Sequence, residues 1–420
     1  MKVLVLNVPG LHGGYLGCYG NEWIETPHLD RLAAQGVLFD QYYADCPDAA
    51  GEQRSSWTGR YHFPASGKAP EPTAEQASSL PRLLQDQGIG FALVGGPGLS
   101  GFPEDGKIPG QEETERRCLA ALEQMAGREY GLVWVDWPSL APPWEVPEEV
   151  LDRYFAADAE EEEAEPLAPW LDPPAGALDL SDDIALERLQ NTYAAAVTAL
   201  DARLGGLLEE LEERGLGSDL LLCVMSDRGL ALGEHGVVGD GRPWLHEEVL
   251  HRVLLVRLPG DGEAGRRVFA LTQPVDLLPT VLEAFGLPVP AEVHGRTLWP
   301  LVRGEAEQVR AYACAGRRLE ETAEWALRTP EWGFILPESA AAAGPLRGPQ
   351  LYVKPDDRWE VNNVLQHHLD LADHLEQVLR GFVEASRRPG PLQPPELRGV
   401  PGELSQGEGK PATEATSSGD

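Results

Sequence analysis

The 420-residue sequence predicts an α/β fold built on a parallel sheet, and two observations lead to this prediction. Short runs of branched and leucine residues alternate with amphipathic helical stretches, which is typical of parallel α/β architecture. Hydrophobic residues make up 42% of the chain, enough for a sizeable core. The chain is therefore predicted to be folded, and a mostly disordered protein is excluded.

The elements follow from local patterns. Val3–Val8 is the first expected strand. In the helix that follows, Thr26 is placed to be the N-cap and Gly36 the C-cap. Large apolar residues at helical spacing over 193–211 predict a long helix. The other strands expected in this part of the chain are Phe91–Val94, Leu132–Val135, Leu220–Met225 and Val253–Val256.

Three parts are expected along the chain: an α/β domain over 1–304, a small C-terminal α+β subdomain over 305–385, and a disordered tail over 386–420. The large domain carries an acidic, Pro-rich insertion at about 156–182, which we expect on the surface. The tail is rich in Pro, Gly, Ser and Glu and has few large apolar residues. The elements expected in the subdomain are Trp325–Arg328, Gly333–Leu336, Gln350–Val353 and a closing helix over Leu369–Phe382.

Charge and cysteine content restrict the function and the location. The chain has 34 Lys+Arg and 68 Asp+Glu, a net charge of −34 that repels nucleic acid and anionic lipid. The N-terminus does not resemble a targeting signal, and no apolar run approaches the roughly 20 residues of a membrane span. The five cysteines are widely spaced and form no C-x-x-C pair, so neither a disulfide framework nor a zinc ribbon is indicated. We predict a cytoplasmic protein that binds neither nucleic acid nor membrane.

A series of motifs keeps its order and spacing from about residue 2 to 382. The motifs include LGCYGN at 16–21, TPHLDRLA at 26–33, TGRY at 58–61, GEHG at 233–236 and GRTL at 295–298. Together they resemble the sulfatase family of the alkaline-phosphatase-like superfamily. The resemblance implies a large mixed, mainly parallel sheet flanked by helices, a Ca²⁺ site, and hydrolysis of sulfate esters by a Cys or Ser converted to formylglycine.

The metal ligands that the resemblance implies are mostly missing. Pro9 and Gly10 stand where the family has an Asp, often a pair, after the first strand. Asp227 matches a metal-binding Asp, but Arg228 follows it where Asn or His is expected. Because arginine has no lone pair to offer a cation, we expect the Ca²⁺ site to be lost, and we predict no cofactor.

The nucleophile motif is also degenerate. Aligning it on the Thr-Gly pair at 58–59 places Ala49 at the nucleophile and Gln53 at the arginine. A shift of one residue recovers an arginine at 54 but still leaves an alanine at the nucleophile. Cys46 lacks the motif's spacing and is expected to be an ordinary buried or semi-buried cysteine. Ser55 and Ser56 are expected to face solvent at the start of a helix.

At four further positions, this chain lacks the Lys or His that the resemblance implies. Gly96 and Gly98 replace a Lys and a His, Ala141 or its neighbour replaces a His, and Asp240 replaces a Lys.

The leading hypothesis is a catalytically inactive sulfatase-like protein that binds a small molecule or a protein, which could be an active sulfatase. A residual pocket could contain Asp136, Arg228, Glu234 and His235. One alternative is a sulfuric-ester or phosphoester hydrolase or transferase with an active site rewired around Asp227. Another is a structural subunit of a larger assembly.

Overall fold

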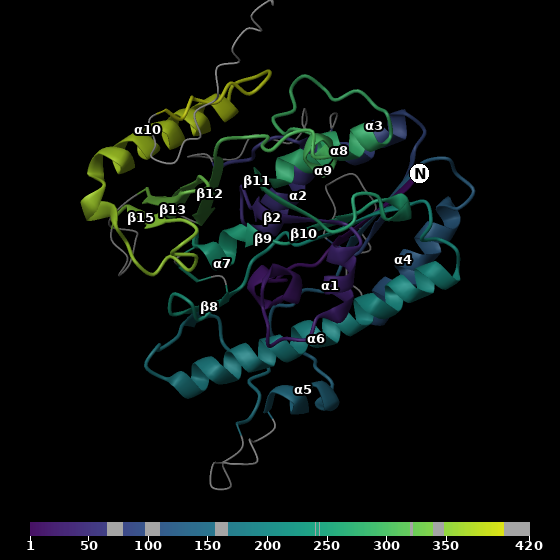
Figure 1. The fold of residues 1–420 in the computed structure, drawn as a ribbon, viewed down its shortest axis with the longest axis horizontal. Helices are drawn as coiled ribbons and strands as arrows, with labels where there is room; N and C mark the ends of the chain where they lie inside the picture. The colour runs from purple at the N-terminus through teal and green to yellow at the C-terminus, as the bar shows by residue number, and fades with distance from the viewer. Residues whose placement is uncertain are drawn as a thin grey trace, which may run out of the picture.

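The computed structural model describes residues 1–64, 79–96, 110–155, 167–239, 241–242, 244–319, 322–338 and 348–398. Figure 1 shows a large central sheet with helices on both sides and a smaller sheet beside it, covered by the C-terminal helix α10. No helix within these ranges has the length and the apolar character that a membrane span requires.

The central sheet is mixed and mainly parallel. Its strands lie in the order β11-β2-β10-β6-β1-β4-β3, with β9 beside β2. β10 pairs antiparallel with both of its neighbours and β9 pairs antiparallel with β2, whereas the other pairs are parallel. The strands are β1 (Lys2–Asn7), β2 (Val37–Tyr43), β3 (Gly90–Val94), β4 (Gly131–Asp136), β6 (Leu220–Met225), β9 (His251–Arg252), β10 (Leu254–Arg257) and β11 (Arg266–Thr272).

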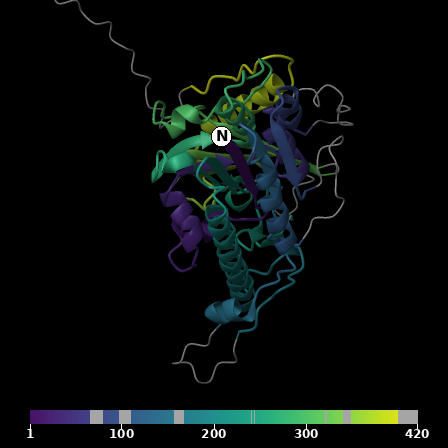
Figure 2. The same cartoon turned by 90° about the vertical axis from the view of Figure 1, so that its right-hand side faces the viewer.

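Two helical layers cover this sheet, because alternate residues of each strand face opposite sides. In β1, Leu4 and Leu6 pack towards α1, α4 and α6, whereas Val3 and Val5 pack towards α2, α3, α8 and α9. Figure 2 shows the sheet between the two layers. The helices of the large domain are α1 (Pro27–Ala34), α2 (Ala49–Thr58), α3 (Leu80–Asp86), α4 (Gln111–Met125), α5 (Glu148–Phe155), α6 (Asp183–Glu213), α7 (Glu247–Leu250), α8 (Leu277–Ala284) and α9 (Trp299–Val302).

The C-terminal part is a four-stranded antiparallel sheet in the order β12-β13-β14-β15, with α10 packed on it. Residues of both sheets form one buried cluster that includes Tyr43, Leu250 and Ile335, so the two sheets are packed together. The elements are β12 (Ala313–Leu319), β13 (Thr322–Arg328), β14 (Trp332–Pro337), β15 (Gln350–Val353) and α10 (Leu369–Ser386). These observations confirm the predicted fold class.

Several local expectations are corrected. Gln35, and not Gly36, is the C-cap of α1. A glycine is needed at 36 for a different reason, since a Cβ there would lie 2.5 Å from the carbonyl oxygen of Val256. Thr26 is the N-cap residue of α1, as predicted, but its hydroxyl makes no capping bond. It accepts a hydrogen bond from the backbone N–H of Gly17 and pairs with the Asp30 carboxylate.

Two segments predicted to be peripheral are partly built into the fold. In the insertion, residues 156–166 lie outside the described ranges, but Trp170 packs on the α6 side of the core. Farther along the insertion, β5 (Gly176–Ala177) pairs with β8 (Val237–Gly239). Strand β8 also pairs with β7 (Ala231–Leu232). The tail was predicted to be disordered from 386. That is wrong up to 398, because Leu392 packs on the C-terminal core and the Pro395 carbonyl accepts a hydrogen bond from the Tyr312 hydroxyl. Residues 399–420 lie outside the described ranges.

Candidate functional site

Three polar side chains meet where β1, β4 and β6 end, at one edge of the central sheet. The side-chain N–H₂ of Asn7 donates to Asp136 Oδ1 at 2.9 Å and to Asp227 Oδ2 at 2.8 Å. The three strands are parallel, so their carboxyl ends lie side by side. All three side chains are buried. The indole N–H of Trp134 also donates to Asp136 Oδ1, at 2.9 Å.

Burial dominates the electrostatics of these carboxyl groups. It raises the pKa of Asp136 to about 6; the hydrogen bond from Asn7 lowers that pKa, and the charge of Asp227 raises it. Burial also raises the pKa of Asp227, although the Asn7 hydrogen bond and the charges of Arg228 and Arg252 act in the opposite direction. The cluster therefore favours a reduced negative charge, with one proton on Asp136 in mildly acidic solution.

The residues around Asp227 do not fit a Ca²⁺ site. Ca²⁺ takes six to eight oxygen ligands, but Pro9 and Gly10 have no side-chain oxygen. The Gly10 carbonyl oxygen accepts a hydrogen bond from the Tyr193 hydroxyl, and Arg228 brings a positive charge. An amide donor lies between the two carboxylates. Among the described residues, no group of three or more His, Cys, Asp and Glu side chains could hold a metal ion.

Helix α2 contains the positions aligned with the nucleophile motif. Ala49 is its first residue, after the N-cap Asp48, and Gln53 is buried. Cys46 is buried before the helix, as predicted. Burial and the nearby Asp48 carboxylate raise the pKa of its thiol well above the usual value. At neutral pH it is therefore a thiol and not the nucleophilic thiolate.

The two serines of α2 were predicted to face solvent, and this is wrong. Ser55 and Ser56 are both buried, and the Ser55 hydroxyl donates to Asp45 Oδ2 at 2.6 Å. Neither hydroxyl is presented at the surface.

A buried ion pair lies close to Asp227. Arg252 and Glu52 are both fully buried, with 3.8 Å between Arg252 Nη2 and Glu52 Oε1. Burial raises the pKa of Glu52, and the charge of Arg252 lowers it. Gly229 leaves the space for this arginine, since a Cβ there would lie 2.2 Å from Arg252 Nη1. Arg252 therefore supplies positive charge beside Asp227 from inside the protein.

The loops after β3 and β4 close around Asp136 and Gly10. A Cβ on Gly96 would lie 1.8 Å from Asp136 Oδ2, and Gly96 has a φ of +74°, so only glycine fits there. Ala141 lies against Gly10, because a Cβ on Gly10 would approach the Ala141 backbone nitrogen to 3.4 Å. Gly98 and Asp240 lie outside the described residues.

Glu234 and His235 lie in a different hydrogen-bond network from Asp136 and Asp227. Glu234 Oε2 accepts a hydrogen bond from the Leu232 backbone at 2.6 Å. His235 Nδ1 lies 2.8 Å from Glu248 Oε1, and its Nε2 lies 3.2 Å from the Glu360 carbonyl oxygen. Burial alone would lower the pKa of His235, but the hydrogen bond and charge of Glu248 raise it to about 9. Of the predicted residual pocket, Asp136 thus lies in one hydrogen-bond network and His235 in another.

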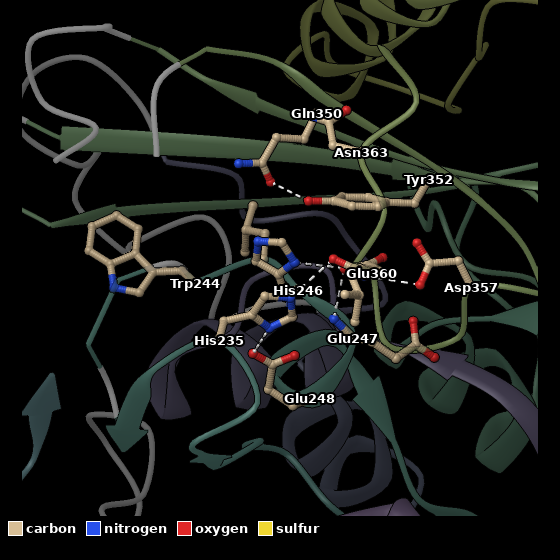
Figure 3. Close-up of polar contacts among 12 residues, drawn as sticks. His235, Trp244, His246, Glu247, Glu248, Gln350, Tyr352, Asp357, Glu360 and Asn363 are labelled. Carbon is tan, nitrogen blue, oxygen red and sulfur yellow. Dashed lines mark hydrogen bonds and ion pairs between the residues drawn. The ribbon is translucent and has the colours of Figure 1, made fainter. Parts of the chain in front are cut away.

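Glu360 is the centre of this second network. Its buried carboxylate pairs with Arg328 at 2.7 Å, His246 at 3.0 Å and Lys354 at 3.1 Å. Burial would raise the pKa of Glu360, but the charge of Arg328 and the hydrogen bond from His246 lower it to about 2. Figure 3 shows the rings of His235 and His246 facing each other beside Glu360; their centroids lie 3.8 Å apart.

Sequence reasoning missed Asn7, Arg252 and Glu360. Asn7 carries a weak signal, because it is the polar residue that ends an otherwise apolar strand. The sequence gives no role to Arg252 or Glu360, since the partners of both are distant along the chain.

Comparisons with known proteins show which proteins the chain is related to. The sequence model of the family described as "Sulfatase" matches residues 4–287, more than half of the chain. An N-acetylglucosamine-6-O-sulfatase of Bacteroides thetaiotaomicron is 34% identical over 121 residues, which cover 29% of this chain and 21% of that protein. Mouse steryl-sulfatase is 26% identical over 410 residues, covering 73% of this chain and 65% of that protein. The chain thus spans less than two thirds of the length of these relatives.

Solved structures share the fold. The phosphonate monoester hydrolase of Agrobacterium radiobacter has a TM-score of 0.68 at 20% identity, covering 90% of this chain and 95% of its own. A 2-O GAG sulfatase has a TM-score of 0.65 at 19% identity, covering 95% and 98%. With the match to the family's sequence model over 4–287, these findings show that the chain belongs to the sulfatase family.

Proposed function

We propose that this sulfatase-family protein does not hydrolyse sulfate esters and acts by binding a small molecule or a protein. The observation that carries the proposal is the placement of Asn7, whose N–H₂ group donates to both Asp136 and Asp227. In sulfate-ester hydrolysis a divalent cation and an activated nucleophile are needed to act on the dianionic group. Here an amide donor lies between the two carboxylates that would have to bind the cation.

Two further observations support the proposal. The thiol of Cys46 is buried and has a raised pKa, so it is a poor nucleophile. Arg228 and Arg252 already supply positive charge to Asp227, which reduces the attraction of this site for a cation. The five cysteines are all free, and this agrees with the cytoplasmic location that is part of the proposal.

The test is a hydrolysis assay with a metal analysis of the same purified protein. We expect no turnover of 4-nitrophenyl sulfate or 4-nitrophenyl phosphate, with or without added Ca²⁺, and no stoichiometric divalent metal. Turnover that is lost in Asp227→Ala but kept in Asp219→Ala would contradict the proposal. It would favour the alternative, a hydrolase with an active site rewired around Asp227. Asp219 is a suitable control because it lies on the surface, and its carboxylate pairs with the chain's first two residues.

A further inference from the structure

A polar cavity of about 220 Å³ lies between the central sheet and the loop that follows β15. Its volume is many times that needed for one water molecule, so it can hold a small ligand. Tyr19 and Tyr43 line it together with charged residues of β2, β9 and β11 and of the 354–358 loop. Asn7, Asp136 and Asp227 are not among its lining residues, so this cavity is separate from the edge of the sheet described above.

The two carboxylates of the lining already have cationic partners. Asp40 Oδ1 lies 3.2 Å from Arg267 Nη1, and Glu247 Oε2 lies 3.1 Å from Lys354 Nζ. Arg358 is different: within the described part of the chain it has no carboxylate partner, and its guanidinium lies 5.0 Å from the centre of the Trp359 ring. Stacking on a ring face leaves the N–H groups at the edge of the guanidinium available to a ligand.

His251 is held in the lining by two polar contacts. Its Nε2 lies 2.7 Å from the Asp40 carbonyl oxygen, and its Nδ1 lies 3.2 Å from Glu247 Oε1. The rings of Tyr43 and Tyr19 lie 5.3 Å and 5.9 Å from the His251 ring and hold it in place.

The lining therefore carries three cationic side chains, Arg267, Lys354 and Arg358, against two carboxylates, in a protein whose net charge is −34. The electrostatic environment of His12, buried nearby, agrees with this excess. Burial chiefly lowers its pKa to about 3; the positive charge of Arg358 lowers it too, while Glu247 raises it.

We propose that this cavity binds a small anion through Arg358, with Lys354 and Arg267 supplying the surrounding positive charge. The ligand class is a compact oxyanion with two negative charges, either a phosphate group or a pair of carboxylates. Arginine recognises both through paired N–H···O bonds. This inference rests on the proposed function, because it names the class of ligand that the proposed binding protein would hold.

The test is calorimetric titration of the full-length protein with inorganic phosphate and, separately, with succinate, at constant ionic strength. We expect saturable one-to-one binding of at least one of the two anions. The anion that binds more tightly shows whether the cavity prefers a phosphate group or a pair of carboxylates. Arg358→Gln should weaken this binding about tenfold, the value of a lost hydrogen bond between charged groups. Gln41→Glu, which adds a negative charge to the lining, should also weaken it.

Arg303→Gln is the matched control. Arg303 lies 5.1 Å from the centre of the Trp299 ring, as Arg358 does over Trp359, but it lies outside the cavity. Equal binding by Arg358→Gln, Arg303→Gln and the unchanged protein, or no saturable binding of either anion, would overturn the proposal. The hydrolysis assay is a separate measurement. If the protein hydrolyses the esters and also binds the anion in this cavity, only the proposed lack of hydrolysis is overturned. If it neither hydrolyses the esters nor binds the anion, only the proposed anion site is overturned.

Discussion

At the scale of single residues, Asn7 controls the edge of the sheet where the strand ends meet. A carboxamide can donate two hydrogen bonds and carries no charge. It donates one to Asp136 and one to Asp227. Both buried carboxyl groups therefore have a hydrogen-bond partner within the fold.

The raised pKa of Asp136 leads to a prediction about stability and pH. Its pKa is about 6 in the folded protein against 3.8 for an unperturbed Asp, so the folded state holds the proton more tightly. The contribution is fully present below about pH 4 and is lost as the pH rises through 6. Between pH 7 and pH 5, Asp136 should thus add about 1 kcal/mol to the free energy of unfolding.

Asp136→Asn isolates this contribution. Asp45 and Glu234 also have raised pKa values of about 7, so the unchanged protein alone cannot assign the effect. Urea unfolding of both proteins at pH 5 and pH 7 should show a gain on acidification that is about 1 kcal/mol smaller in Asp136→Asn. An identical pH dependence in the two proteins would contradict the assignment.

At the scale of elements, the sequence predicted strands with a continuous apolar run better than strands interrupted by polar residues. β1, β4 and β6 lie inside the sheet as uninterrupted or nearly uninterrupted apolar runs, as expected of parallel strands covered on both faces. β2 and β11 were missed. Asp40 and Gln41 interrupt the apolar run of β2, and β11 is an edge strand that begins with two arginines and exposes Phe269.

The candidate site was predictable only in part, for a related reason. Motif spacing identified Asp227 and the departures at Pro9 and Gly10, because these depend on neighbours along the chain. Asp136 was named from the sequence, but its contact with Asn7 depends on which strands lie side by side, and the partners of His235 come from residues 248 and 360. Contacts between such distant positions leave no local pattern in a single sequence.

Helix α6 offers a prediction from two adjacent glycines. A Cβ on Gly206 would meet nothing within 4 Å, whereas a Cβ on Gly205 would lie 2.2 Å from the His28 ring. Gly206→Ala should therefore stabilise the protein by about 0.5–1 kcal/mol through helix propensity alone. Gly205→Ala should destabilise it, because α1 must move away from α6. Thermal unfolding of the pair measures the difference, and a similar gain from both substitutions would contradict the packing of α1 against α6.

At the scale of the whole molecule, the net charge of −34 acts against compactness. The Debye length falls from about 30 Å at 0.01 M salt to about 10 Å at 0.1 M, so added salt should screen the repulsion and raise the melting temperature. CaCl₂ and MgCl₂ at equal ionic strength should have equal effects, because the residues beside Asp227 do not fit a Ca²⁺ site. A stabilisation specific to Ca²⁺, saturating at one equivalent, would contradict this interpretation.

The two sheets are held together by the buried network around Glu360. This residue follows β15, and its carboxylate joins Arg328 of β13 and Lys354 to His246, which precedes α7 of the large domain. Removing one charge from such a network leaves its partners buried without compensation, which costs about 3–5 kcal/mol. Glu360→Gln should lower the free energy of unfolding by that amount. It should also increase hydrogen exchange in α7 and β15 together, since Glu360 joins both sides.

Glu331→Gln is the control for this substitution. Glu331 lies in the neighbouring turn, and its carbonyl oxygen accepts a hydrogen bond from the Lys354 backbone. Among the described residues, its carboxylate has one weak contact, of 3.4 Å, with the Thr329 hydroxyl. Its replacement should change stability by no more than about 0.5 kcal/mol. If Glu360→Gln cost as little as the control, or if exchange rose in β15 but not in α7, the network would not be what couples the two sheets. In that case the apolar cluster that contains Tyr43, Leu250 and Ile335 would have to carry the coupling alone.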